Sequence, residues 1–329
     1  AREAVTARPF LCPTIPCHLT RILFLHGRNM SRAFLFPGQG SQQVGMGQTL
    51  YERSPEARAI FDEADALLGF SLSTLCFSGP EETLTDTHNQ QPALFATSMA
   101  MAAVLAAQDA SPPAFVAGHS LGELSALAAA GSLTFADGLA LVRRRGELMK
   151  AAGEQEPGAM AAVLGLDLPV VVDLCAQAAA QHSRPIQVAN DNCPGQIVIS
   201  GDKEALATAV SLANAAGARK TVVLPITIAA HSPLMASASA DFGTAVDDTP
   251  IYPPRVPIIG NVTAQPLLTP EDIRAELKAQ LTSSVLWTAS MNYLLSQGVD
   301  TVVEVGPGDV LLSLMKRIDR QTKREKVEV

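Results

Sequence analysis

A pentapeptide near the middle of the chain, Gly118-His119-Ser120-Leu121-Gly122, restricts the fold more than any other feature. It follows a short apolar run, residues 114–117, and precedes an alanine-rich apolar stretch, residues 123–130. Glycines on both sides of a serine allow the cramped turn that joins a buried strand to a helix and exposes the hydroxyl. The pentapeptide therefore predicts an α/β fold with Ser120 as a candidate nucleophile. An ordinary turn whose serine caps the next helix is the alternative.

The 329 residues are 47% hydrophobic and 17% charged, which suits one large α/β domain or a large domain with an insert. Between residues 158 and 225 the pattern changes to β-α-β-β-α-β, the order of a ferredoxin-like unit. We expect strands at 159–164, 186–189, 196–200 and 220–224, and helices at 170–181 and 203–216. Residues 158–225 are thus predicted to form a small subdomain inserted into a large one made of 30–157 and 226–329.

In the large subdomain, an apolar run at 33–36 predicts a strand that enters the glycine-rich loop Pro37-Gly38-Gln39-Gly40. Later strands are expected at 256–260 and 301–305. Helices are expected at 55–68, at 135–149, and from Pro92, which is predicted to open a helix, to about Gln108. This alternation completes the predicted α/β architecture.

Residues 1–29 differ from the rest, with four arginines, one acidic residue and no clear periodicity. We interpret them as a non-native or extension segment, and an arginine-rich organelle transit peptide is the alternative. The whole chain has a net charge of −8. Such acidity argues against a nucleic-acid partner. The number of cysteines, five, is odd, and the last three, Cys76, Cys175 and Cys193, form no paired motif, which favours a reduced compartment. No apolar run is long enough to span a membrane, and we expect a cytoplasmic location.

One basic run stands out against this acidity at the C-terminal end of the chain. We expect a solvated helix end, which could also receive an acidic protein partner. The run consists of Lys316, Arg317, Arg320, Lys323, Arg324 and Lys326.

A serine nucleophile needs a base, and His231 is the best candidate among six histidines. It lies after an apolar run, residues 222–230, and directly before Ser232-Pro233, which favours the start of a helix. His119 adjoins Ser120 and should point away from it, and His182 is explained as a helix end. Because a neutral imidazole is required, an ordinary histidine pKa predicts that activity falls below pH of about 6.5.

Attack of the serine on an acyl carbon creates an oxyanion, which needs two N–H donors. The N–H of Leu121 follows the nucleophile, and the loop containing Gln39 could supply the second donor. Arg145 lies three residues from Val142 and Leu148, so it should lie on the apolar face of its helix. A guanidinium there needs an anion, which is either a structural ion-pair partner or a substrate carboxylate.

Together these motifs resemble the malonyl-CoA:acyl carrier protein transacylases of fatty acid synthesis and the related acyltransferase domains of polyketide synthases. The matching segments follow the order of that family from residue 30 to about residue 317. They are 36–42, 118–123, 145–146, 192–201, 231–235, 280–281 with Trp287, and 304–308.

The resemblance implies an α/β-hydrolase-like large subdomain with an inserted ferredoxin-like small subdomain. It implies that Ser120 is the nucleophile, that His231 is the general base without a triad carboxylate, and that Arg145 binds the malonyl carboxylate. The remaining implied site residues are Gln39 and Leu121 as oxyanion donors, and Gln280 and Asn192 in substrate binding. The substrates would be malonyl-CoA and an acyl carrier protein, with no cofactor or metal, and we expect a monomer.

The sequence departs from many relatives at Ala229-Ala230, where they carry a phenylalanine before the catalytic histidine. Some bacterial malonyl-specific members have small residues there, so malonyl is the predicted acyl group. Tolerance of methylmalonyl stays open. Whether the carrier protein serves fatty acid or polyketide synthesis also stays open. Two rival functions are a serine hydrolase, which would leave Arg145 without a purpose, and a non-catalytic carrier-docking module, which would form no acyl-enzyme.

Overall fold

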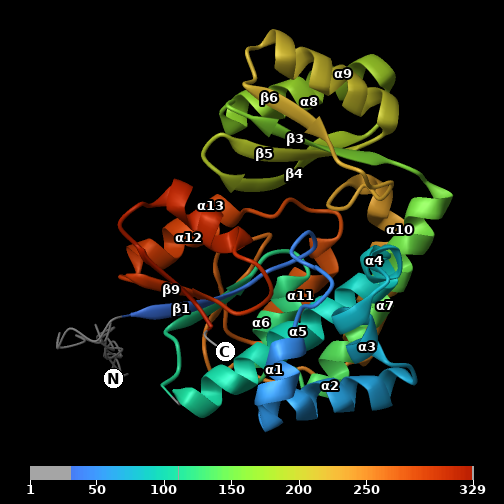
Figure 1. Ribbon diagram of the computed structural model, residues 1–329. Helices are drawn as coiled ribbons and strands as arrows, with labels where there is room; N and C mark the ends of the chain where they lie inside the picture. The colour runs from blue at the N-terminus through green and yellow to red at the C-terminus, as the bar shows by residue number, and fades with distance from the viewer. Residues whose placement is uncertain (1–30, 110, 328–329) are drawn as a thin grey trace, which may run out of the picture.

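A computed structural model describes residues 31–109 and 111–327 and contains two separate sheets (Figure 1). The extension predicted at 1–29, with Cys12 and Cys17, lies outside the described residues. The larger sheet lies among most of the helices, and the smaller sheet lies above it with two helices of its own (Figure 1). This arrangement is the predicted one: an α/β subdomain with an inserted antiparallel unit.

The large sheet has six strands in the order β10-β9-β1-β2-β7-β8. Neighbouring strands are parallel except at the β7–β8 pair. Because parallel strands end at one edge, the loops that follow β1 and β2 lie side by side there. The bounds are β1 (Arg32–Phe36), β2 (Phe115–Gly118), β7 (Ile258–Ile259), β8 (Pro266–Leu267), β9 (Thr301–Glu304) and β10 (Lys323–Lys326).

Helices cover both faces of this sheet because side chains alternate along its buried strands. In β1, Ala33 and Leu35 pack with α12 (Trp287–Ser296) and α13 (Val310–Ile318), whereas Phe36 belongs to the larger core on the other face. The helices of that core are α1 (Gln48–Arg53), α2 (Pro55–Leu68), α3 (Leu72–Ser78), α4 (Glu81–Thr85), α5 (Thr87–Gln108), α6 (Gly122–Ala129), α7 (Phe135–Gln155), α10 (Ala236–Asp248) and α11 (Pro270–Gln280).

The small sheet is antiparallel, with the order β4-β5-β3-β6. Its elements follow the predicted β-α-β-β-α-β sequence, and a core of their own lies between the sheet and the two helices. The predicted α/β fold class with its inserted unit is confirmed, while the predicted subdomain limits stay a prediction. The bounds are β3 (Ala159–Leu164), α8 (Leu168–His182), β4 (Ile186–Cys193), β5 (Gln196–Gly201), α9 (Lys203–Ala215) and β6 (Lys220–Val223).

The prediction that Pro92 opens a helix is wrong, because α5 begins at Thr87 and contains Pro92. A proline lacks the N–H that would bond to the carbonyl four residues earlier. That carbonyl, on His88, instead accepts a hydrogen bond of 2.9 Å from Nη1 of Arg143 on α7. A partner from a neighbouring helix therefore satisfies the carbonyl that Pro92 leaves free.

The basic C-terminal run also differs from its prediction as a helix end. Helix α13 ends at Ile318, and residues 323–326 form β10, an edge strand parallel to β9. Because β10 is an edge strand, its polar side chains can remain partly in solvent while its backbone pairs with β9. The run is thus divided between a helix and a strand.

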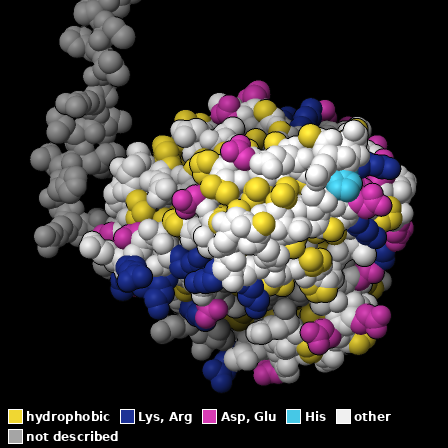
Figure 2. Space-filling view, turned by 90° about the horizontal axis from the view of Figure 1, so that it is seen from above, with side chains coloured by type: hydrophobic (Ala, Val, Ile, Leu, Met, Phe, Trp, Pro, Cys, Tyr) yellow, Lys and Arg dark blue, Asp and Glu magenta, His cyan; other side chains and the backbone are white. Residues whose placement is uncertain are grey.

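None of the helices within 31–109 and 111–327 is both long enough and apolar enough to cross a membrane. Seen from above, Lys and Arg side chains gather on one flank of the molecule, while much of this face carries apolar or uncharged groups (Figure 2).

Candidate active site

Ser120 lies on the tight turn between β2 and α6, with a φ of 52°. Left-handed backbone is unusual for serine and is typical of a strained strand-to-helix elbow. The two flanking glycines are required by close contacts. A Cβ on Gly118 would lie 1.9 Å from the carbonyl oxygen of Gly122, and a Cβ on Gly122 would lie 2.0 Å from that of Phe36. The elbow predicted from the pentapeptide is present.

His231 lies beside this elbow, although 111 residues separate it from Ser120 in the chain. Its Nε2 lies 2.8 Å from Ser120 Oγ, and its backbone is also left-handed, with a φ of 57°. The helix start predicted at Ser232-Pro233 is present: Ser232 caps the short 3₁₀ helix η1 (Pro233–Met235), which continues directly into α10. The two side chains predicted to act together are therefore within hydrogen-bond distance.

Backbone carbonyls orient the His231 ring. Nδ1 lies 2.9 Å from the carbonyl oxygen of Gln280 and 3.1 Å from that of Ser283. A carbonyl can only accept, so Nδ1 carries the proton and Nε2 is left to accept the Ser120 hydroxyl proton. In the described part of the chain, no carboxylate forms an ion pair with this ring. The arrangement differs from a Ser-His-Asp triad in its third member.

Burial lowers the pKa of His231 to about 3, and the positive charge of Arg145 contributes in the same direction. Both effects disfavour the imidazolium form. The sequence-based expectation assumed an ordinary pKa of about 6.5. In the folded protein the ring therefore stays neutral, and able to accept a proton, at pH values well below that.

Arg145 projects from α7 into the same site and is 1% exposed. Its Nη2 donates to Ser120 Oγ at 3.2 Å and to Gln280 Oε1 at 2.9 Å, and its Nη1 donates to Gln91 Oε1 at 3.0 Å. Burial lowers its pKa to about 10, so the group is charged at neutral pH.

The sequence left two possible anions for Arg145, a structural ion-pair partner and a substrate carboxylate, and the hydrogen-bond partners of Arg145 bear on this choice. Within 31–109 and 111–327, no carboxylate lies close enough to Arg145 for an ion pair, and its Nε has no hydrogen-bond partner. A buried charge held only by neutral groups is costly unless an anion reaches it. The direct structural ion pair is therefore not formed, and the guanidinium is available to a ligand.

The two N–H groups predicted for the oxyanion lie on adjacent loops. Gly38 approaches the elbow so closely that a Cβ there would lie 2.3 Å from the His119 carbonyl oxygen and 3.7 Å from the Leu121 nitrogen. Neither Leu121 nor the exposed Gln39 donates its backbone N–H within the part of the chain described by the structure. The loop that carries Gln39 thus packs against the elbow that carries Leu121, and neither of these backbone N–H groups has an acceptor among the described residues.

Asn261, which is not among the predicted site residues, holds the elbow through hydrogen bonds of its side chain. It follows β7 and is 1% exposed. Its Oδ1 accepts the Ser120 N–H at 2.7 Å, and its Nδ2 donates to the Gly118 carbonyl at 2.7 Å and to Glu123 Oε1 at 3.0 Å. No motif marks this asparagine, since its partners are about 140 residues away.

Gln280 supports the other side of the elbow. Its Nε2 donates to the Ser120 carbonyl at 3.0 Å and to the buried Glu123 carboxyl. Burial raises the pKa of Glu123 well above its ordinary value, and the nearby Glu276 adds to this effect, while donors from Asn261 and Gln280 oppose it. The Glu123 carboxyl therefore accepts hydrogen bonds from the side-chain amides of Asn261 and Gln280. Both amides also form hydrogen bonds with the backbone of Ser120.

Asn192 lies on β4, away from these contacts. Its Oδ1 lies 2.8 Å from His119 Nε2, and the His119 ring stands edge-on to Trp287 with 5.3 Å between ring centroids. His119 thus points away from Ser120, as predicted. Asn192 connects the small sheet to the elbow through His119, and no hydrogen bond joins it to Ser120 or His231 in the described residues.

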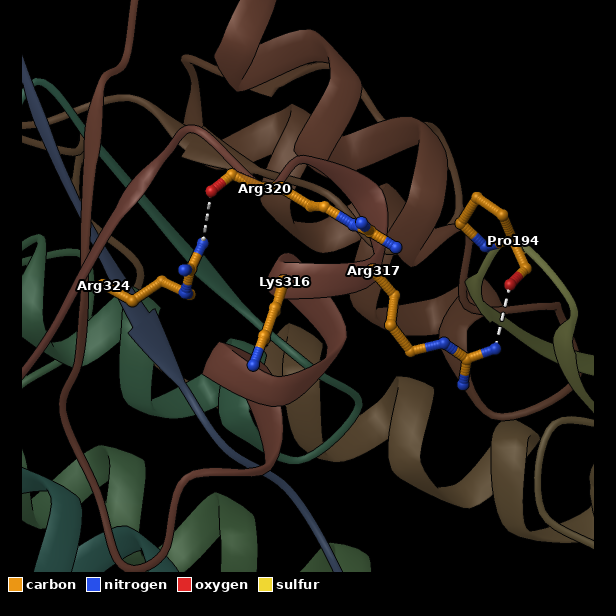
Figure 3. Close-up of a pocket in the computed structure, with 5 residues that line it drawn as sticks. All are labelled: Pro194, Lys316, Arg317, Arg320 and Arg324. Atoms are coloured by element: carbon orange, nitrogen blue, oxygen red, sulfur yellow. Dashed lines mark hydrogen bonds between the residues drawn. The ribbon is translucent and has the colours of Figure 1, made fainter.

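Four residues of the basic run line a pocket of about 380 Å³ together with Pro194 (Figure 3). Arg317 donates to the Pro194 carbonyl at 3.0 Å and to Gln196 Oε1, so it joins α13 to the β4–β5 hairpin. The other lining side chains are Lys316, Arg320 and Arg324. Among the described residues that line this pocket none is acidic, which suits an anionic group.

Comparison with known proteins agrees with this geometry. A family model described as "Acyl transferase domain" matches residues 33–329. The malonyl CoA-acyl carrier protein transacylase of Bacillus subtilis (strain 168) is 44% identical over 291 residues, which cover 88% of this chain and 91% of that protein.

Solved structures give the same result. The crystal structure of malonyl-CoA:acyl carrier protein transacylase from Xanthomonas oryzae pv. oryzae aligns with a TM-score of 0.87 and 43% identity, over 91% of this chain and 94% of that one. A malonyl-transacylase in complex with its type II polyketide synthase acyl-carrier protein aligns with a TM-score of 0.87 and 37% identity. The alignment covers 90% of this chain and 96% of that one. Motifs, fold and site thus agree, and the chain belongs to the malonyl CoA-acyl carrier protein transacylase family of acyl transferases.

Proposed function

We propose that this protein transfers malonyl from malonyl-CoA to the phosphopantetheine thiol of acyl carrier protein, through an ester on Ser120, and so supplies fatty acid biosynthesis. One observation carries the proposal. Ser120 Oγ lies 2.8 Å from the neutral His231 imidazole and 3.2 Å from the Arg145 guanidinium, which has no ion-pair partner within the described residues. A nucleophile, a base and an anion binder therefore meet at one hydroxyl.

In the first half-reaction, Ser120 Oγ attacks the thioester carbon while His231 Nε2 takes the hydroxyl proton. The carbonyls of Gln280 and Ser283 keep the other ring proton on Nδ1 and stabilise the imidazolium that forms. Collapse of the tetrahedral intermediate breaks the carbon–sulfur bond, and His231 returns its proton to the leaving coenzyme A thiolate. The product is a malonyl ester on Ser120.

The negative charge that develops on the carbonyl oxygen needs preorganised donors. We assign this role to the N–H groups of Leu121 and Gln39, which have no other acceptor among the described residues. Gly38 permits the necessary approach of the two loops. In the second half-reaction the same donors serve the attack of the carrier thiol, with His231 as its base.

Arg145 is assigned to the malonyl carboxylate. Its planar group can hold a carboxylate with two parallel hydrogen bonds, and burial strengthens that interaction. Acetyl lacks the carboxylate and so lacks this interaction. The assignment is supported by the free Nε of Arg145 and by the absence of an ion pair to it in the described part of the chain.

The carrier protein is the expected partner, and the basic pocket of α13 and β10 fits an acidic one (Figure 3). The solved relative in complex with an acyl-carrier protein supports the same class of partner. Asn192 is kept as a proposed substrate-binding residue through its contact with His119. The monomeric state and the cytoplasmic location stay predictions.

The proposal is tested by a two-step transfer. The enzyme is incubated with malonyl-CoA, acetyl-CoA or methylmalonyl-CoA in parallel, desalted, and then mixed with carrier protein bearing phosphopantetheine. Intact mass spectrometry should find malonyl on the enzyme after the first step and on the carrier after the second. Release of free malonate without transfer to the carrier would indicate a hydrolase, and no adduct at all would indicate a docking module.

A further inference from the structure

We propose that Gln187, on the small sheet, is a positioning residue for the general base, because its side-chain amide ties the backbone of His231 to the segment that orients the imidazole. The inference rests on the proposed function and adds to it a residue from outside the large sheet and its helices. Gln187 lies on β4, and no motif of the sequence marks it.

The Gln187 amide contacts two backbone carbonyls outside the small sheet at once. Its Nε2 donates to the carbonyl oxygen of His231 and to that of Thr282, each at 2.9 Å. Carbonyl oxygens can only accept, so the nitrogen end of the amide has to face them. Gln187 therefore joins the loop of the base to the segment that follows α11.

The His231 backbone needs such a tie. Its φ of 57° is left-handed, which is unfavourable for a residue with a side chain and persists only where the surrounding structure holds it. Within residues 31–109 and 111–327, Gln187 is the only hydrogen-bond donor to the His231 carbonyl. Loss of the amide would therefore free the peptide group that sets the direction of the imidazole.

The second bond of Gln187 reaches the segment that supplies the acceptors of the imidazole. His231 Nδ1 lies 2.9 Å from the Gln280 carbonyl oxygen and 3.1 Å from the Ser283 carbonyl oxygen, and Thr282 lies between these two residues in the chain. The bond to the Thr282 carbonyl thus fixes the short loop that keeps the proton on Nδ1. One amide holds both the backbone of the base and the acceptors of its ring.

Strand β4 continues this support along the same segment, and it is the strand of the small sheet that lies nearest to the large sheet (Figure 1). The Val285 N–H donates to the Ala189 carbonyl at 2.8 Å, and the Val285 carbonyl accepts from the Asp191 N–H at 3.0 Å. Ser284 Oγ donates to the Val188 carbonyl at 2.5 Å. The edge of the small sheet therefore fixes residues 282–285, and Gln187 lies at the end that reaches the base.

The contacts of Gln187 separate it from the anion binder. In the described part of the chain it forms no hydrogen bond with Arg145 or with the Ser120 hydroxyl. Its loss should therefore impair proton transfer to His231 without changing the recognition of the malonyl carboxylate. The effect should be the same for every acyl group.

Two substitutions of Gln187 test the inference. Gln187→Met removes the amide and keeps the approximate volume of the side chain. Gln187→Glu keeps the shape of the side chain and replaces the amide by a carboxyl group, which donates a hydrogen bond only when it is protonated.

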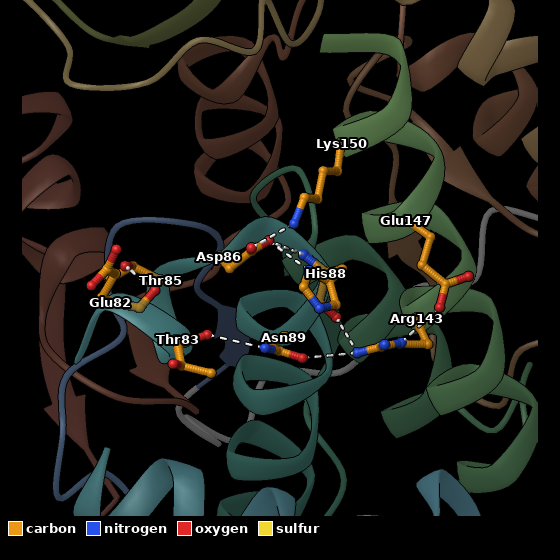
Figure 4. A network of polar contacts seen from close by, with 9 residues as sticks. All are labelled: Glu82, Thr83, Thr85, Asp86, His88, Asn89, Arg143, Glu147 and Lys150. Carbon is orange, nitrogen blue, oxygen red and sulfur yellow. Dashed lines mark hydrogen bonds and ion pairs between the residues drawn. The ribbon is translucent and has the colours of Figure 1, made fainter. Parts of the chain in front are cut away.

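Two further variants are controls. Thr288→Val is matched to Gln187→Met, because Thr288 Oγ1 also joins β4 to the segment after α11, at 2.9 Å from Asp191 Oδ1, but does not contact His231. Lys150→Met removes the ion pair of 2.6 Å with Asp86, within the polar network that fastens α7 to α5 (Figure 4). It reports the effect of losing a polar contact between two helices away from the base.

The measurement is single-turnover acylation of Ser120 by malonyl-CoA and by acetyl-CoA, analysed as a maximal rate constant and a half-saturating concentration. A first-order rate constant does not depend on how much of the enzyme is folded. We expect Gln187→Met to lower the maximal rate constant about 10-fold for both acyl groups, and to change the half-saturating concentration less than about 3-fold. Each control should change both quantities less than about 3-fold.

Gln187→Glu adds a pH profile that a purely structural role would not alter. As pH falls from about 8 to about 5, protonation of the introduced carboxyl restores one donor, so its maximal rate constant should rise about 3-fold or more relative to that of Gln187→Met. His231, with a pKa of about 3, and Arg145, with a pKa of about 10, keep their charge in this range. His119 and Asp191 are common to both variants, so their titration cancels from the ratio.

An unchanged maximal rate constant in Gln187→Met, an equal fall in Thr288→Val, or a rise in the half-saturating concentration alone would overturn the role of Gln187. Identical pH profiles of the two Gln187 variants would also contradict it. These outcomes would leave the proposed function intact, since the wild-type enzyme would still acylate Ser120 with malonyl. Absence of a malonyl-enzyme in the wild-type protein would instead refute the function itself.

Discussion

The Gln280 backbone carbonyl oxygen lies 2.9 Å from His231 Nδ1, and the side-chain oxygen of the same residue accepts a hydrogen bond from Arg145 at 2.9 Å. One residue at the end of α11 thus orients the base through its backbone and the guanidinium through its amide. The proton-transfer group and the anion-binding group are held by a common support. Their relative position therefore depends on where α11 ends.

The acid limb of the acylation rate is predicted to lie well below pH 6.5. Burial lowers the pKa of His231 to about 3, and a base is active in its neutral form, which persists above its pKa. Pre-steady-state acylation should therefore remain near its neutral-pH rate at about pH 5, where an imidazole with an ordinary pKa would be mostly protonated. A midpoint near pH 6.5 would contradict the burial of His231.

The same pKa makes folding stability depend on pH. Below pH of about 6.5 the unfolded chain protonates this histidine while the folded chain does not, down to about pH 3. The stability contributed by the neutral ring is therefore present above that window and is lost as pH falls through it. Chemical denaturation of the wild-type protein and of His231→Gln should show a smaller acid sensitivity in the variant. Equal sensitivity would indicate that other groups account for the effect.

Arg145→Ala should reduce acylation by malonyl-CoA far more than acylation by acetyl-CoA. The variant loses charge-assisted bonds to the carboxylate, which implies a loss of malonyl kcat/KM of about 100-fold. Arg145→Lys, which keeps the charge but not the planar fork, should lie between the variant and the wild type. Equal losses for both acyl groups would assign Arg145 to a purely structural role.

Asn261→Ala should slow acylation by malonyl-CoA and acetyl-CoA to the same extent, by about 10-fold or more. Its side chain holds the Ser120 N–H and the Gly118 carbonyl, so its loss disturbs the nucleophile without touching Arg145. Unsatisfied buried groups should also lower the unfolding free energy by about 1–3 kcal/mol. Kinetics with both substrates and thermal unfolding measure these effects. A selective loss for malonyl would place Asn261 with the anion binder instead.

Gly118→Ala and Gly122→Ala should each destabilise the protein by about 2 kcal/mol or more, because the added methyl groups would overlap backbone atoms. Gly243→Ala, in the middle of α10, is the matched control. Its Cβ would meet only Lys278 at 3.5 Å, and alanine is the better helix former, so we expect no loss or a gain of about 0.5–1 kcal/mol. Similar melting temperatures for all three variants would show that the elbow tolerates side chains.

Local patterns predicted the parts of this structure that depend on neighbours in the chain. The glycine-flanked serine marks its own turn, and the apolar spacing around Arg145 places it on the buried face of α7. The elements of the small sheet were predicted in their correct order, and most lie close to their predicted limits, since short apolar or helical stretches alternate with clear breaks; β4 extends four residues beyond its predicted end. The pairing of Ser120 with His231 came from the family resemblance and from the need for a base.

The sequence could not reveal features that depend on distant partners. Asn261 and Gln91 look ordinary in the sequence, and only the meeting of segments 54 to 141 residues apart gives them contacts with the site. Pro92 is accepted within α5 because Arg143, from another helix, satisfies the carbonyl it leaves free. Strand β10 is polar throughout, so its pairing with β9 carries no hydrophobic signal. In each case tertiary structure overrides a local preference.

The central claim is that malonyl is carried as an ester on the Ser120 hydroxyl. Tandem mass spectrometry of the malonyl-CoA-treated enzyme tests it most directly, with Ser120→Ala treated in parallel. We predict that the modification maps to Ser120 in the wild-type protein and is absent from the variant. A malonyl adduct that persists in Ser120→Ala, or that maps to another residue of the wild-type enzyme, would contradict the account.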